Sequence, residues 1–100
     1  AKLSLAMLAD QKLIEIAAGL ASSEQAPDLI MLEIAITDYY LHSYGSDHPL
    51  TEWSLRTADA QVGLLMDRLR QAGTLDDYNF AIMSDHGHGP MRDAIYCDQL

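Results

Sequence analysis

The pattern of apolar and polar positions predicts two helices separated by a proline break. Apolar residues recur at helical spacing through residues 1–20, and a polar cluster ending at Pro27 stops that period. A second apolar stripe, stepping by three and four positions, runs through residues 51–69. Gly73 follows it as a natural C-terminal stop. We therefore expect a helix at the start of the chain and a longer one in its second half.

Two short apolar runs, residues 28–36 and 79–83, predict buried β-strands. Neither run alternates cleanly, which is typical of strands covered on both faces in a parallel sheet, and Glu33 is the one charge inside the first run. A strand, a crossover helix and a second strand form a right-handed parallel βαβ unit. The pattern therefore predicts the α/β class, with an N-terminal helix ahead of a parallel βαβ unit.

Polar loops are expected after both predicted strands, at residues 37–49 and 84–90. We expect the first to be irregular apart from one helical turn at its start, with Ser46 or Asp47 capping the next helix and Pro49 in its first turn. In a parallel α/β sheet, ligands bind outside the carboxyl ends of the strands. Both loops should then lie on the same rim of the sheet.

The charge balance excludes several classes of partner. The 100 residues include 15 acidic and 6 basic side chains, for a net charge of −9. Nucleic-acid polymers and anionic membrane surfaces attract basic proteins, so we expect this chain to bind neither. No apolar run reaches the roughly 20 residues of a membrane span, and no signal-peptide pattern is present. We expect a soluble chain and assign it no compartment.

All four histidines lie in the two polar loops, and two of them have an aspartate partner. Asp38 and His42 stand four apart, which suits one face of a helical turn, and Asp85 directly precedes His86. Carboxylate oxygens and neutral imidazole nitrogens are the usual ligands of zinc and related divalent ions. The two pairs are therefore candidate metal ligands, with plain Asp–His hydrogen bonds as the alternative.

Other chemically suggestive residues have simpler explanations. His48 precedes a helix and is expected to be a solvated side chain. Three tyrosines of the first loop either line a substrate pocket or pack against neighbours: Tyr39, Tyr40 and Tyr44. Cys97, the single cysteine, excludes an internal disulfide and a cysteine-based zinc cluster, and we expect no catalytic role for it.

Three motifs in order resemble those of one enzyme family. They are Pro27–Met31 at the first predicted strand, Asp38–Gly45 after it, and the Ser-Asp-His-Gly sequence of residues 84–87. With Asp59 near the middle of the intervening helix, they resemble the type I phosphodiesterase/nucleotide pyrophosphatase family of the alkaline phosphatase superfamily. The resemblance covers residues 27–89. It implies that residues 1–100 are a fragment of one alkaline phosphatase-like three-layer α/β/α domain.

The same resemblance implies a hydrolase with two divalent ions, zinc or alternatively manganese. Asp38 and His42 would hold one ion and Asp85 and His86 the other. A Thr or Ser nucleophile and the remaining ligands would lie outside this chain, which then contains no catalytic residue. The substrate would be a small phosphate ester or a nucleotide. We expect His88, where many members carry methionine, to be a bystander, with contact to a ligand or to the substrate as alternatives.

Two other interpretations stay open at this stage. The chain could come from another enzyme of the superfamily: a cofactor-independent phosphoglycerate mutase, a phosphonoacetate hydrolase or a sulfatase. It could instead be a non-catalytic α/β module for binding or assembly. In either case we expect the isolated 100-residue chain to be inactive and to self-associate through surfaces that a larger sheet would cover.

Overall fold

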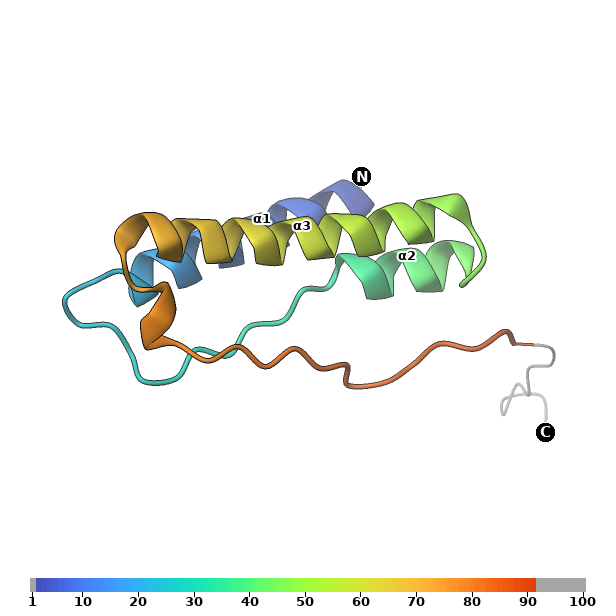
Figure 1. The fold of residues 1–100 in the computed structure, drawn as a ribbon. Helices are drawn as coiled ribbons and strands as arrows, with labels where there is room; N and C mark the ends of the chain where they lie inside the picture. The colour runs from blue at the N-terminus through green and yellow to red at the C-terminus, as the bar shows by residue number, and fades with distance from the viewer. Residues whose placement is uncertain (1, 92–100) are drawn as a thin grey trace, which may run out of the picture.

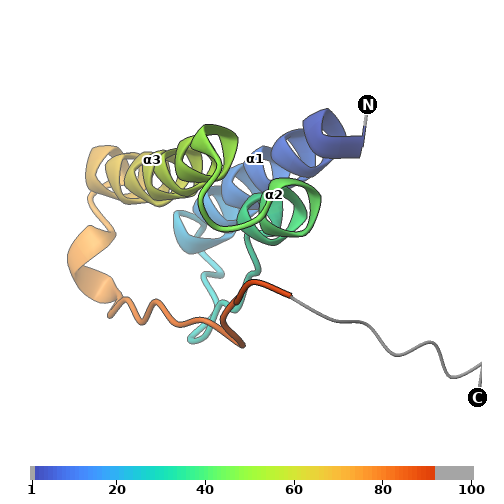
Figure 2. The same cartoon turned by 90° about the vertical axis from the view of Figure 1, so that its right-hand side faces the viewer.

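Residues 2–91, which the computed structural model describes, form three α-helices and one short 3₁₀-helix. These elements are α1 (Lys2–Ala21), α2 (Ile36–Tyr44), α3 (Pro49–Ala72) and η1 (Leu75–Asp77). Helices α1 and α3 lie side by side and run in the same direction, while the shorter α2 runs against them (Figure 1). Viewed end-on, the three helices form one cluster and two extended segments pass beneath it (Figure 2).

Helix α1 covers the predicted range but buries a different face from the one its leucines suggest. Its buried face consists of Ala6, Asp10, Ile14, Ala17, Ala18 and Ala21. Small side chains on this face let neighbouring helices approach closely. Five larger apolar side chains, here called the outer apolar face of α1, are exposed: Leu5, Leu8, Leu13, Ile16 and Leu20. The helix itself was predicted correctly.

Helix α3 begins and ends at local signals in the sequence. The cap is His48, whose Nδ1 accepts a hydrogen bond from the Leu50 amide at 3.1 Å, so the expectation of Ser46 or Asp47 was wrong. At the other end Gly73 takes the left-handed conformation, with φ of 78°. The amide of Thr74 donates to the carbonyl of Leu69, and that of Gly73 to the carbonyl of Arg70, which completes a Schellman motif.

The predicted parallel βαβ unit is absent from the described residues, so the α/β assignment was wrong for this part of the chain. Residues 28–35 and 79–83 form no strand, and Ile36 already belongs to α2. A strand is stabilised by a hydrogen-bonded neighbour about 4.8 Å away and by burial of its side chains. Neither segment pairs with a neighbouring strand in the described residues. Their side chains are also not buried, since Met31 is 87% exposed and Met83 is 84% exposed.

Helix α2 replaces most of the predicted loop, and its N-terminal cap comes from another helix. Its own N-cap residue, Ala35, offers no side-chain hydrogen bond. Instead Asp10 of α1, which is 1% exposed, accepts bonds from the amides of Ala35 at 3.0 Å and Ile36 at 2.8 Å. The carboxylate satisfies two amides that would otherwise lack partners and lies at the positive end of the helix dipole. Asp10 therefore fixes where α2 begins.

The interior between the helices is partly polar. Buried polar residues are Asp10, Thr51, Ser54 and Gln61. The Thr51 hydroxyl donates to the carbonyl of Gly45 at 2.7 Å, which holds the start of α3 against the end of α2. None of the helices in residues 2–91 combines the length and apolar character that crossing a bilayer requires.

Candidate metal centre

Helix α2 presents Asp38 and His42 on one face. The residues are four apart, so their side chains lie one above the other along the helix. The Asp38 Oδ1 atom is 3.5 Å from the Nε2 atom of His42. Both side chains are accessible, with exposed fractions of 45% for Asp38 and 69% for His42. A carboxylate and an imidazole therefore face the same space beside α2.

The second predicted pair, Asp85 and His86, lies on the extended segment that follows η1, and this segment places His86 beside Asp38. The Nε2 atom of His86 lies 3.6 Å from Asp38 Oδ1 and 3.6 Å from Oδ2 of its neighbour Asp85. This segment crosses beneath the helices toward α2 (Figure 1). Near its start the Tyr78 hydroxyl donates to the carbonyl of Pro27 at 2.9 Å and ties it to the other extended segment. The two pairs thus meet without a sheet edge between them.

His88, which we expected to be a bystander, belongs to the same cluster. Its Nε2 atom is 3.0 Å from Asp38 Oδ1, and its side chain is only 19% exposed. Its ring meets the ring of His42 edge-on, with centroids 4.8 Å apart. The sequence did contain a signal: His86 and His88 are two apart, and alternate side chains of an extended chain point to the same side. We call Asp38, His42, Asp85, His86 and His88 the Asp38 cluster.

Hydrogen bonds and charges within the cluster shift two pKa values. The hydrogen bond from His88 lowers the pKa of Asp38, and attraction to the nearby imidazoles lowers it further. The carbonyl of Gly87, which can accept a bond from Nδ1 of His86, raises the pKa of His86, and the Asp85 carboxylate adds to this effect. Asp38 therefore stays ionised, while His86 holds its proton more strongly than an isolated imidazole.

Two of the three tyrosines on α2 pack against neighbouring aromatic rings. Tyr40 lies against Tyr44 and Trp53, with ring centroids 5.7 and 5.4 Å away. Tyr44 stacks on His48, whose ring is therefore both an α3 cap and a packing partner. Packing, one of the two explanations offered for these tyrosines, thus accounts for two of them. Asp59 is exposed on α3. Cys97 lies outside the described residues.

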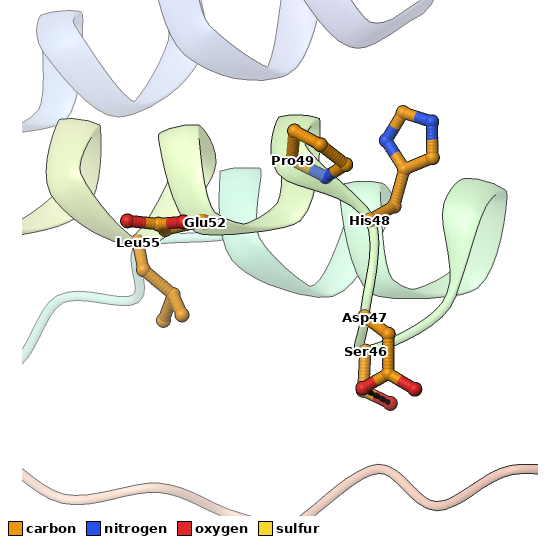
Figure 3. Close-up of a pocket in the computed structure, with 6 residues that line it drawn as sticks. All are labelled: Ser46, Asp47, His48, Pro49, Glu52 and Leu55. Atoms are coloured by element: carbon orange, nitrogen blue, oxygen red, sulfur yellow. Dashed lines mark hydrogen bonds between the residues drawn. The ribbon is translucent and has the colours of Figure 1, made fainter.

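A shallow pocket at the entry to α3 is separate from the Asp38 cluster. Figure 3 shows its six lining residues, which are Ser46, Asp47, His48, Pro49, Glu52 and Leu55. None of them is a member of the cluster. The pocket therefore adds nothing to the candidate metal ligands.

Comparison with known proteins identifies the family of the chain. The family model described as type I phosphodiesterase / nucleotide pyrophosphatase matches residues 2–100. The chain belongs to this family. A member of the ectonucleotide pyrophosphatase/phosphodiesterase family, member 3 of Bos taurus, is 30% identical over 76 residues. That match covers 76% of the chain and only 8% of the bovine protein, so the chain corresponds to a small part of its relative. No solved structure matches the chain.

Proposed function

We propose that this chain supplies metal ligands to a hydrolase that cleaves phosphodiester or nucleotide pyrophosphate bonds. The observation that carries the proposal is the convergence of Asp38, His42, Asp85 and His86, from two distant segments, in a chain of this family. The nucleophile, a Thr or Ser, would come from outside residues 1–100. The isolated chain would then be inactive, since it would lack that nucleophile.

The donor atoms of the cluster suit two divalent ions of the zinc type. Asp38 and His42 would bind one ion, and Asp85 and His86 the other. Carboxylate and imidazole donors are preferred by zinc, and manganese accepts the same carboxylates. The side chains converge on a shared space, since Asp38 Oδ1 lies 3.5 Å from His42 Nε2 and 3.6 Å from His86 Nε2. When bound, two such ions would stabilise the attacking and leaving oxygens during displacement at phosphorus.

The residues of this chain prepare the site through their charge and position. The lowered pKa of Asp38 keeps its carboxylate ionised and able to bind a cation. His86 must lose a proton before its nitrogen can bind a metal, and its raised pKa moves that loss to higher pH. Asp10 holds the start of α2 through the amides of Ala35 and Ile36 and thereby orients both ligands on that helix.

Hydrolysis of bis(p-nitrophenyl) phosphate by the protein in its full natural length tests the proposal. We expect Asp38→Ala and Asp85→Ala each to reduce the rate to background. Asp47→Ala is the matched control, because Asp47 is an exposed carboxylate whose side chain bonds to Ser46 outside the cluster. Full activity of either cluster variant would refute the assignment of the ligands. Preference for the monoester p-nitrophenyl phosphate would favour another reaction of the superfamily.

A further inference from the structure

Helix α3 depends on a histidine side chain to complete its first turn. Pro49, the first residue of the helix, has no amide hydrogen to donate. The amides of Thr51 and Glu52 both donate to the backbone carbonyl of His48, at 2.9 and 3.3 Å. The Leu50 amide donates to the imidazole Nδ1 atom of His48, at 3.1 Å. The imidazole therefore supplies the acceptor for Leu50, while the backbone carbonyl supplies it for the next two amides.

This cap requires the neutral form of the imidazole. A neutral histidine has one ring nitrogen that donates and one that accepts, whereas a protonated histidine donates from both. Protonation of His48 at Nδ1 would therefore set its N–H group against that of Leu50. The added positive charge would also lie at the positive end of the α3 dipole. Because histidine is the side chain whose charge ordinarily changes between about pH 5 and 8, modest acidification acts directly on this cap.

The carboxylates near His48 attract its protonated form. Asp47 and Glu52 line the same shallow pocket as His48 (Figure 3). Glu52 is already paired with Arg56, whose guanidinium donates to it at 2.7 Å. The side-chain partner of Asp47 is the neutral hydroxyl of Ser46, which leaves the negative charge of Asp47 available to an imidazolium. Asp47 is therefore the carboxylate that competes with the cap when His48 gains a proton.

Two contacts connect the cap to α2. The ring of Tyr44, which carries no charge in this pH range, stacks on the ring of His48 with centroids 4.7 Å apart. Thr51, which is buried and follows Leu50 directly, donates from its hydroxyl to the carbonyl of Gly45 at 2.7 Å. A change in the first turn of α3 therefore acts on the end of α2.

We propose that His48 is a pH-sensitive cap of α3. Its neutral imidazole holds the first turn of the helix, and protonation releases that turn as the imidazolium moves toward Asp47. The side chains of His48 and Asp47 leave the backbone in opposite directions, so the ring must turn away from the Leu50 amide to approach the carboxylate (Figure 3). The device lies outside the Asp38 cluster and does not depend on the proposed hydrolase function.

Amide hydrogen exchange in the protein of full natural length tests this device. The measured quantity is the protection factor of the Leu50 amide, which corrects for the intrinsic effect of pH on exchange, at pH 8 and at pH 5. His48→Asn keeps an acceptor at both pH values, and His48→Ala has none at either. We expect the wild-type protein to match the asparagine variant at pH 8. At pH 5 its protection should fall about 5-fold, to the level of the alanine variant.

Two results would overturn the proposal. One is wild-type protection of Leu50 that stays at the level of the asparagine variant at pH 5. The other is equal protection of Leu50 in the asparagine and alanine variants, which would show that the side chain at position 48 does not cap the helix. The Thr74 amide at the far end of α3 donates to the backbone carbonyl of Leu69 and is the internal control. Its protection should be the same in all three proteins.

Asp47→Asn tests the role given to the neighbouring carboxylate. Asparagine keeps the size of the side chain and removes its charge, so protonation of His48 becomes less favourable. We expect the midpoint of the change in Leu50 protection to move to lower pH. Asp59→Asn, which removes the charge of an exposed aspartate farther along α3, should leave the midpoint unchanged. Equal midpoints in the two variants would overturn the role of Asp47.

Discussion

Replacing Asp10 should release the start of α2 and, with it, the two ligands on that helix. The Asp10 carboxylate is 1% exposed and accepts two backbone hydrogen bonds, from Ala35 at 3.0 Å and from Ile36 at 2.8 Å. Its substitution by alanine removes both bonds and leaves the two amides without partners. Loss of a helix cap costs about 0.5–2 kcal/mol, and a hydrogen bond to a charged group contributes about 1.5–3 kcal/mol. We therefore expect Asp10→Ala to cost about 2–4 kcal/mol.

Amide hydrogen exchange measures this cost at the place where it acts. A loss of about 2–4 kcal/mol corresponds to exchange about 30- to 700-fold faster at Ala35 and Ile36, since each 1.4 kcal/mol is a factor of ten. Asp10→Asn should also increase the exchange rate. The asparagine side chain has one acceptor oxygen where the carboxylate has two, so it can keep at most one of the two hydrogen bonds in their present geometry.

The control for Asp10→Ala is a variant that removes an aspartate charge at a position away from α2. Asp59 is exposed on α3, so Asp59→Ala should leave exchange at Ala35 and Ile36 unchanged. Equal exchange rates in the Asp10→Ala and Asp59→Ala variants would refute the role of Asp10 as the cap of α2. The same result would remove the proposed link between α1 and the metal ligands of α2.

Three further predictions concern other parts of the chain. Gly73→Ala should lower the free energy of unfolding by about 1–2 kcal/mol, because Gly73 has φ of 78°. Gly63→Ala in the helix interior should raise it by about 0.5–1 kcal/mol. Equal effects of the two substitutions in denaturant unfolding would contradict this reasoning. In metal-free protein, NMR titration should place the pKa of His86 above 6.5, and Asp85→Asn should lower it while the Gly87 carbonyl keeps it raised. The contribution of protonated His86 to stability is then complete below pH 6.5 and disappears as pH rises through the folded-state pKa. The isolated chain should self-associate through the outer apolar face of α1, and a monomer by light scattering at high concentration would argue against this.

The sequence predicted the helices whose signals are local. Helix α3 carries a long apolar stripe, Pro49 in its first turn and Gly73 at its end, and all three signals act within a few residues. Helix α2 was missed because its cap, Asp10, lies about 25 positions earlier in the chain. No local pattern can reveal a cap that arrives through tertiary packing. The two predicted strands failed for a related reason, because an apolar run becomes a strand only when a partner backbone lies beside it.

The four candidate ligands lie close together as expected, but not for the reason that we gave. Asp38, His42, Asp85 and His86 were expected to meet at the rim of a parallel sheet, and the described residues contain no sheet. They meet because an extended segment passes beside α2, as the 3.6 Å separation of Asp38 and His86 shows. The position of His88 beside Asp38 was not predicted, because it depends on which side of that segment faces α2.

The zinc content of the protein shows whether Asp38 is a metal ligand. The protein in its full natural length should be purified with zinc, dialysed against metal-free buffer and analysed for bound metal, alongside its Asp38→Ala variant and the Asp59→Ala control. We expect the wild-type protein and the control to retain bound zinc, and the Asp38→Ala variant to lose at least the ion assigned to Asp38 and His42. An Asp38→Ala variant that retained as much zinc as the wild-type protein would contradict the account.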